Sequence, residues 1–228
     1  MSDDRLIFYG RRKGRPLNAG RQRAMDDLFP GMQMPVDPPQ DQTELQSVFG
    51  PDINDIWLEI GFGNGEHLAE QAARNPQVGM LGCEPYINGV SALVAQAGER
   101  DLDNIRIHAD DARPLMDNLP EACIGRAFVL FADPWPKARH ARRRFIGPDN
   151  LDRLARLIRP GGELRLATDW PQLAAWMLQH TLEHPAFEWL AESASDWRKA
   201  PDDWVPTRYQ IKTEGQGRKP VFLLFRRV

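Results

Sequence analysis

Short apolar runs alternate with amphipathic stretches from residue 55 to the end of the chain. The apolar runs lie at 55–60, 78–83, 104–108, 126–132, 163–167 and 220–226, and the stretches of helical spacing at 66–73, 86–97, 111–119, 148–158 and 171–184. Strands that alternate with helices of this length form βαβ units around a mainly parallel sheet. The sequence therefore predicts an α/β fold whose ligands lie beyond the carboxyl ends of the strands.

The composition excludes several classes of protein. The chain has 228 residues, 42% of them hydrophobic and 27% charged, which suits a packed core and is too apolar for a disordered chain. No apolar run approaches the ~20 residues of a transmembrane helix. The start resembles no secretory signal, and Cys83 and Cys123 form no CxxC pair. We therefore expect no membrane association, no disulfide framework and a cytoplasmic location.

Basic residues are concentrated in two short segments, although the net charge is −3. Residues 5–23 contain seven basic side chains and no acid, and residues 137–144 contain five more. Such patches favour a polyanionic partner, although a run of charge can also be a solvated face. We predict a basic flexible arm at 1–25, a proline-rich irregular lead-in at 26–52 and one domain at 53–228.

A glycine-rich turn follows the first predicted strand. Gly61, Gly63 and Gly65 stand at alternate positions, which allows a tight turn and a close approach of the backbone to a ligand. A dinucleotide-binding turn has the spacing G-x-G-x-x-G, whereas Glu66 stands at the sixth position here. The turn therefore predicts a nucleoside-type ligand and does not by itself fix which one.

Acidic residues mark the ends of the first three predicted strands. Glu59 precedes the glycines, Glu84 ends the second strand, and Asp110 and Asp111 follow the third. A pyrophosphate at the glycine turn would be repelled by Glu59 and Glu66, whereas S-adenosylmethionine carries a sulfonium and an ammonium and no phosphate. The charges therefore favour S-adenosylmethionine over NAD. We expect Glu84 to bind the ribose hydroxyls and Asp110 or Asp111 to accept from the adenine amino group.

The loop after the fourth predicted strand reads Asp133-Pro-Trp-Pro-Lys137. On its own, such a loop is most simply a stiff turn with a capping aspartate. Its place in the fold favours function, because the two prolines would hold an acid and an aromatic ring beside the reactive carbon of the cofactor. The basic residues that follow it, Lys137 to Arg144, would then face phosphates.

Taken together, these motifs resemble the bacterial tRNA (guanine-N7)-methyltransferases, which make 7-methylguanosine at position 46 of the tRNA variable loop. The resemblance covers most of the chain. The matching segments are Arg11–Arg15, Glu59–Gly65, Glu84, Asp111-Ala112, Asp133–His140, Ala167–Trp170 and Thr207–Gln210. The resemblance implies a Rossmann-like class I methyltransferase fold, S-adenosylmethionine as cofactor and tRNA as partner.

The resemblance also implies a role for each matching residue. Glu59, Glu84 and Asp111 would bind the cofactor, and Asp133 would be catalytic and would also belong to the cofactor site. The substrate would be contacted by Lys137, Asp169, Thr207, Arg208, Tyr209 and Gln210. This family usually has Glu where this chain has Gln210, which keeps a hydrogen-bond acceptor and loses the charge, so the role of position 210 stays open. Ala132 stands where Pro is common.

The chemistry of guanine N7 needs little from the protein. N7 has a lone pair and no proton, so we expect no general base and no metal. Asp133 would orient the guanine and offset its developing positive charge.

One motif in the sequence has the spacing of a zinc peptidase, His180-Thr-Leu-Glu-His184. It ends an amphipathic helix and no third ligand follows, so we do not expect it to bind a metal.

The basic arm should bind the tRNA backbone. Deleting residues 1–23 should therefore weaken tRNA binding and flatten its salt dependence.

Two other functions are compatible with parts of this pattern. One is methylation of an exocyclic base amine in RNA or DNA, by enzymes that use a related loop of Asp or Asn followed by Pro-Pro and an aromatic residue; Trp135-Pro136 differs from it in order. The other is a nucleic-acid-binding relative that has lost activity, although the intact glycine turn and its acids disfavour this. No feature of the sequence indicates an obligate protein partner.

Overall fold

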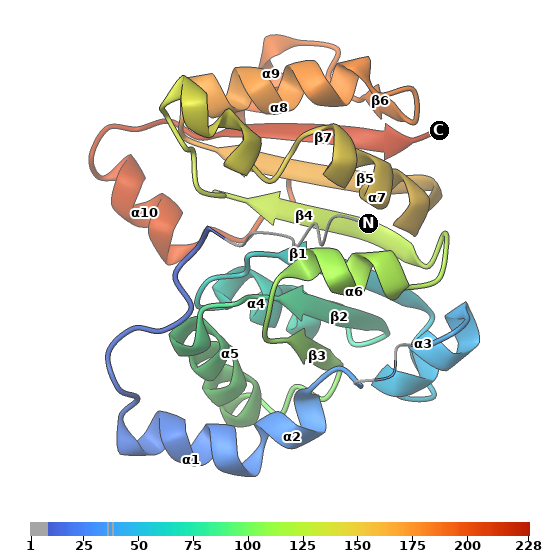
Figure 1. Cartoon of the computed structure of the whole chain (residues 1–228), viewed down its shortest axis with the longest axis vertical. Coiled ribbons are helices and arrows are strands. Elements are labelled where there is room, and N and C mark those ends of the chain that lie inside the picture. Colours follow the sequence, from blue (N-terminus) through green and yellow to red (C-terminus); the bar gives the residue numbers. More distant parts are fainter. Residues whose placement is uncertain (1–8, 36, 38) are drawn as a thin grey trace, which may run out of the picture.

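The computed structural model describes residues 9–35, 37 and 39–228 and contains one central sheet (Figure 1). Its strands are β1 (Asp55–Ile60), β2 (Val78–Cys83), β3 (Ile105–His108), β4 (Ile124–Leu130), β5 (Ile158–Thr168), β6 (Phe187–Trp189) and β7 (Val221–Arg227). Their order is β3-β2-β1-β4-β5-β7-β6. β7 pairs antiparallel with β5 and β6, and the other pairings are parallel. The mainly parallel sheet predicted from the sequence is thus confirmed.

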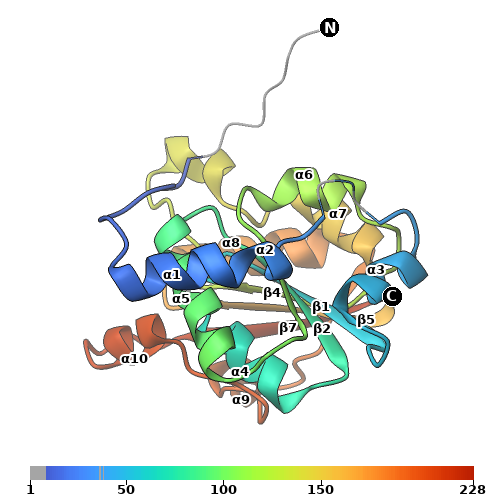
Figure 2. The same ribbon diagram turned by 90° about the horizontal axis from the view of Figure 1, so that it is seen from below.

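Helices cover both faces of the sheet. α4 (Glu66–Arg74) and α5 (Ile87–Glu99) share an apolar cluster with β2 and β3. α6 (Ala112–Asn118), α7 (Pro148–Leu157) and α8 (Pro171–Glu183) share another cluster with β1, β4 and β5. Figure 2 shows α6 and α7 on one side of the strands and α4 on the other. Because β1 to β4 run parallel, the loops after these four strands meet at one end of the sheet.

The segment before β1 corrects the sequence analysis. Three helices lie there: α1 (Ala19–Asp27), α2 (Phe29–Met32) and α3 (Gln42–Phe49). Most of α1 falls in the predicted flexible arm at 1–25, and α2 and α3 fall in the predicted irregular lead-in at 26–52. Asn18 caps α1 and Asp41 caps α3 through their side-chain oxygens. α1 buries none of its residues fully, so it lacks the apolar stripe that would reveal a helix in the sequence. Residues 1–8 of the predicted arm lie outside the described residues.

The C-terminal part contains further elements that the periodicity did not predict. They are the edge strand β6 and the short helices α9 (Ala194–Arg198) and α10 (Arg208–Glu214). α10 turns Gln210 and Thr213 inward, so its buried face is polar.

The fourth strand is shorter at its end than predicted. β4 ends at Leu130, two residues before the predicted end, because Phe131 has a φ of 52°. In the part of the chain that the structure describes, no helix has the length and apolar character needed to cross a bilayer.

Candidate functional site

The turn after β1 requires its glycines. Gly61, Gly63 and Gly65 have φ values of 74°, 60° and 81°, a region that disfavours residues with a Cβ atom. A Cβ on Gly61 or Gly63 would meet no atom within 4 Å, so backbone conformation alone selects glycine there. At Gly65, the N-cap residue of α4, a Cβ would also lie 2.7 Å from Leu93. This tight turn keeps space open at the carboxyl end of β1.

Glu84 connects this turn to the end of β2. One of its carboxylate oxygens accepts a hydrogen bond from Gly63 N at 2.8 Å, and the other accepts one from Tyr86 N at 2.9 Å. Burial raises the pKa of Glu84, although the two backbone N–H groups act against this. A carboxylate has about four lone-pair positions, so Glu84 can still accept hydrogen bonds from a ligand.

The acids after β3 are both engaged with arginines. Asp111 caps α6 and forms an ion pair with Arg113. Burial would raise the pKa of Asp111, but the hydrogen bonds from Arg113 outweigh it and hold the pKa below the usual value. Asp110 is half exposed and pairs with Arg12 at 2.7 Å. The two adjacent acids therefore lie in different surroundings.

Asp133 lies on a loop whose backbone is strained on both sides. Phe131 and Trp135, neither of which is glycine, have φ values of 52° and 41°. Holding a non-glycine residue at positive φ costs on the order of 1 kcal/mol or more of conformational free energy, and such strained residues are concentrated at functional sites. Arg144 holds the loop in place, because its guanidinium donates to the carbonyls of Pro134 and Trp135 at 3.2 and 3.3 Å.

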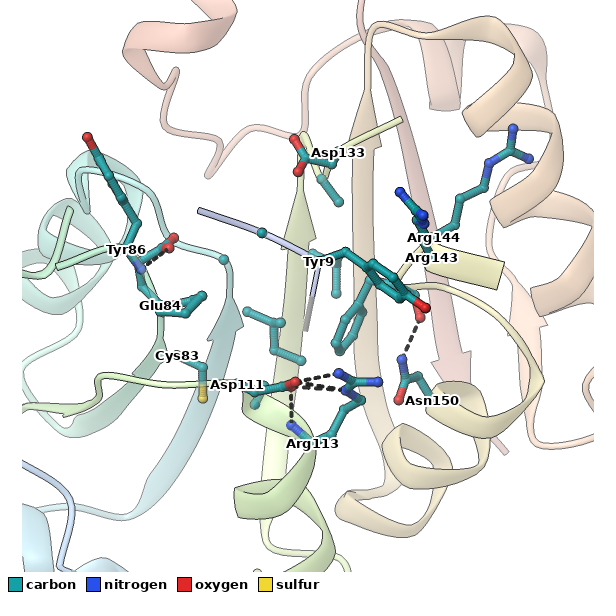
Figure 3. Close-up of a pocket in the computed structure, with 18 of the residues that line it drawn as sticks. Tyr9, Cys83, Glu84, Tyr86, Asp111, Arg113, Asp133, Arg143, Arg144 and Asn150 are labelled. Carbon is teal, nitrogen blue, oxygen red and sulfur yellow. Dashed lines mark hydrogen bonds and ion pairs between the residues drawn. The ribbon is translucent and has the colours of Figure 1, made fainter. Parts of the chain in front are cut away.

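These residues surround one cavity of about 540 Å³ at the carboxyl ends of the strands. Among the residues that line it are Gly61, Glu84, Asp110, Asp111 and Asp133. Figure 3 shows Glu84 on the left of the cavity, Asp133 above it and Asp111 with Arg113 below it. The structure thus brings together acids that lie up to 49 positions apart in the chain.

Tyr9, Trp135 and Arg143 also line the cavity, and Figure 3 shows Tyr9 and Arg143 on the side away from Glu84. The guanidinium carbon of Arg143 lies 4.3 Å from the ring centre of Tyr9 and 4.9 Å from that of Trp135. Tyr9 reaches the cavity because the following residues are tied to α5: Arg12 O accepts from Ile87 N at 3.0 Å, and Gly14 N donates to Asn88 Oδ1 at 2.9 Å. Tyr9 carries no motif, so the sequence analysis did not identify it.

The basic segment 137–144 is divided between two roles. Lys137, Arg139 and Arg142 are exposed. Arg143 and Arg144 are half-buried in the contacts just described, and Arg144 also lies over the Trp176 ring at 4.8 Å. The prediction that all five basic residues form one phosphate-facing stripe is therefore wrong for Arg143 and Arg144. Their burial follows from the loop carbonyls and aromatic rings that they hold.

Some predicted site residues do not line the cavity. Glu59 is buried at 2% exposure, and its carboxylate lies 2.7 Å from His67 Nδ1. Gly63 and Gly65 are set back within the turn, and Lys137 lies on the surface beside the site. Glu59 therefore stands behind the glycine turn, against α4.

The predicted substrate residues form a second group beside the cavity. Tyr209 Oη donates to Asp169 Oδ1 at 3.3 Å, and its ring lies 5.4 Å from that of Phe131. Burial and the Asp169 carboxylate raise the pKa of Tyr209. Thr207 caps α10 by accepting from Gln210 N at 3.1 Å, and Arg208 is exposed. Through Phe131, this group contacts the loop that carries Asp133.

The comparisons with known proteins agree with this architecture. The family model described as "Putative methyltransferase" matches residues 54–223. Two solved structures share the fold at a TM-score of 0.56. The antibiotic-resistance methyltransferase Kmr is 18% identical and aligns over 83% of this chain and 94% of its own. The 16S rRNA methyltransferase KamB is 16% identical and aligns over 83% and 95%. The chain therefore has the class I methyltransferase fold.

Curated relatives are much closer in sequence. The tRNA (guanine-N(7)-)-methyltransferase of Rhodospirillum rubrum is 49% identical over 222 residues, which cover 96% of this chain and 87% of that protein. The enzyme of the same name from Ruegeria pomeroyi is 46% identical over 229 residues, covering 98% and 95%. At this identity, over nearly the whole length of both chains, the protein belongs to the bacterial tRNA (guanine-N7)-methyltransferase family.

Proposed function

We propose that this protein transfers a methyl group from S-adenosylmethionine to N7 of guanine 46 in the variable loop of tRNA, in the cytoplasm. The observation that carries the proposal is the cavity in which Glu84, Asp111 and Asp133 meet at the carboxyl ends of the strands. The names of the curated relatives support the reaction and the class of substrate. The choice of guanine 46 as the methylated base rests on the resemblance of the sequence motifs.

The cavity fits S-adenosylmethionine in size and in chemistry. A volume of about 540 Å³ lies in the range of pockets for molecules of this size. Glu84 retains lone pairs for the ribose hydroxyls, and the glycine turn leaves open space at Gly61. Asp110 or Asp111 would accept a hydrogen bond from the adenine amino group. Glu59 would contribute to the cofactor site from its buried position behind the glycine turn. When bound, S-adenosylmethionine supplies a methyl group that its sulfonium already activates.

The task left to the protein is to position the guanine and to compensate its charge. The purine becomes cationic as N7 is methylated, so a carboxylate held close to it lowers the barrier. Asp133 is an exposed acid on a strained loop that Arg144 fixes, which suits this task. Trp135 and Arg143 offer planar groups beside it for stacking on a base.

The surface around the cavity suits a polyanion. Lys13, Arg15, Lys137, Arg139 and Arg142 are exposed. They would bind tRNA phosphates. Arg208 and Tyr209 of α10 would contact the substrate from the side of Asp169. Asp169 itself is buried and would act by holding the Tyr209 hydroxyl.

Analysis of the product tests the proposed reaction against its alternatives. The protein would be incubated with labelled S-adenosylmethionine and unmodified tRNA, and the RNA would then be digested to nucleosides. We expect 7-methylguanosine as the labelled product. A nucleoside methylated on an exocyclic amine would replace the proposed target while keeping the cofactor. Cofactor binding by calorimetry without any transfer to RNA or DNA would support the inactive relative.

The affinity for S-adenosylmethionine should depend on the ionisation of Glu84. Because the pKa of Glu84 is raised, protonation begins above the pH range of an ordinary glutamate. Protonation turns one acceptor oxygen into a donor, so the dissociation constant should rise as the pH falls through this raised pKa. Glu84→Gln should bind more weakly at neutral pH and lose this pH dependence. Calorimetry at a series of pH values measures both, and an unchanged pH dependence in the variant would remove Glu84 from the ribose site.

The charge of the arm should set the salt dependence of tRNA binding. A deletion of residues 1–23 would remove half of α1, so we test the charge alone with the double variant Lys13→Gln and Arg15→Gln. If both residues neutralise phosphates, the slope of log K against log salt should become shallower by about 0.7–0.9 for each phosphate left without its basic partner. Filter binding at several salt concentrations measures this slope. Lys199→Gln, at the exposed residue that follows α9, is the control. An equal slope in the double variant and in the unaltered protein would contradict the role of the arm.

A further inference from the structure

Gln210 points into the protein and away from solvent. It is 4% exposed, although its neighbour Tyr209 is 41% exposed. Its side-chain Oε1 accepts from Trp204 Nε1 at 2.8 Å, and its Nε2 donates to Glu214 Oε1 at 3.0 Å. The amide is thus engaged on both sides by the protein itself, which does not suit a side chain that contacts tRNA.

Trp204 is the centre of the contacts behind α10. It is 9% exposed and belongs to an apolar cluster on the sheet with Phe128 and Phe222. Its ring lies 4.7 Å from the ring of Phe222 and 5.6 Å from that of His67. An indole N–H buried in such a cluster needs an acceptor, because an unsatisfied buried donor costs the full loss of its hydration.

A second glutamine, on the helix that follows the glycine turn, holds the residue next to Trp204. Gln71 of α4 donates through Nε2 to the backbone oxygen of Asp203 at 3.0 Å. The same Nε2 lies 3.4 Å from Nε2 of His67, whose other ring nitrogen contacts Glu59. Hydrogen-bonded groups therefore lead from the end of β1 to Asp203, and from the next residue, Trp204, to α10.

We propose that Gln210 is a positioning residue, whose task is to accept the hydrogen bond of Trp204 and thereby hold α10 so that Arg208 and Tyr209 face the substrate. This inference deepens the proposed function and rests on it. Glutamate has the same kind of oxygen acceptor, so it could also accept the hydrogen bond of Trp204. The donor that glutamate lacks is needed only by Glu214, which is exposed and can turn to water.

Four variants separate positioning from direct contact with tRNA. Gln210→Met removes the acceptor at similar volume, Trp204→Phe removes the donor, and the third variant combines both. Gln210→Glu keeps the acceptor and adds a charge. We expect Gln210→Met to raise the KM for tRNA about tenfold, as for one buried donor left unsatisfied, with the affinity for S-adenosylmethionine unchanged. Trp204→Phe should raise it similarly, the combined variant no further, and Gln210→Glu should stay near the wild-type KM.

The pattern of these values decides the proposal. If Gln210 contacts tRNA directly, the effects of Gln210→Met and Trp204→Phe multiply, and the new charge of Gln210→Glu changes the KM strongly. Gln216→Met, an exposed glutamine just beyond α10, is the matched control and should leave the KM unchanged. Should Gln210→Met be too unstable to assay, Gln210→Glu and Trp204→Phe still decide: a strong change in the first, or none in the second, overturns the proposal.

A thermal unfolding cycle on the same four variants gives a readout that needs no tRNA. The losses in melting temperature from Gln210→Met and Trp204→Phe should not add, because both break the same hydrogen bond. Additive losses would overturn the pairing. Failure of the proposed function has a different signature, because the unaltered protein would then transfer no methyl group to tRNA.

Discussion

Replacing Asp133 with alanine is expected to lower kcat by about 100- to 1,000-fold, the usual effect of removing a group that stabilises charge in the transition state. The affinity for S-adenosylmethionine should change by no more than about twofold, because the hydrogen bonds of Glu84 and of the glycine turn remain. Single-turnover rates with saturating tRNA, together with calorimetry of the cofactor, measure the two quantities separately.

Two further variants give this prediction its controls. Asp133→Asn keeps the shape and loses the charge, so it should resemble alanine if charge compensation is the role of Asp133, and resemble the wild type if hydrogen bonding suffices. Asp202→Ala removes an exposed aspartate that does not line the cavity and should leave kcat unchanged. A near-normal rate for Asp133→Ala would contradict the catalytic assignment.

Gly65→Ala is expected to destabilise the protein more than any other single methyl added to the glycine turn. The left-handed φ of 81° costs ~1–2 kcal/mol for alanine. The added Cβ would also lie 2.7 Å from two side-chain atoms of Leu93 in the core, and overpacking of this kind costs a further ~1–3 kcal/mol. The free energy of unfolding should therefore fall by about 2–5 kcal/mol, as measured by urea denaturation.

Gly63→Ala is the matched comparison in the same turn. Its φ is 60° and no atom lies within 4 Å of the added Cβ, so it should show the conformational cost alone, about 1–2 kcal/mol. Leu93→Ala should relieve the contacts with Cδ1 and Cγ of Leu93 but not that with its Cβ, so its effect combined with Gly65→Ala should be somewhat smaller than the sum of the two single effects. Equal losses for Gly63→Ala and Gly65→Ala would show that contact with Leu93 does not matter.

The βα core could be predicted from the sequence because its elements carry strong apolar periodicity. β1, β2 and α7 begin where the pattern placed them, since their buried faces are continuous. The elements that the pattern missed lack such faces. α1 has no fully buried residue, α10 buries polar side chains, and β6 has only three residues. Their stability comes from tertiary contacts and caps, which a single sequence displays weakly.

The candidate site could be predicted where a residue type follows directly from its place at a strand end. The three glycines adopt the left-handed conformations that the turn requires, and Glu84, Asp110, Asp111 and Asp133 line one cavity. Neither the approach of Tyr9 nor the inward direction of Arg144 could be predicted. Both depend on contacts between segments far apart in the chain, with α5 in one case and with the loop carbonyls and Trp176 in the other.

The atom that receives the methyl group is the most direct test of this account. Two otherwise identical tRNAs would be compared, one with guanine and one with 7-deazaguanine at position 46, in which carbon replaces N7. We predict that the protein methylates the guanine tRNA, and that the 7-deazaguanine tRNA binds with similar affinity and accepts no methyl group. Equal methylation of both tRNAs would contradict the account, because the reacting atom would then lie elsewhere in the RNA.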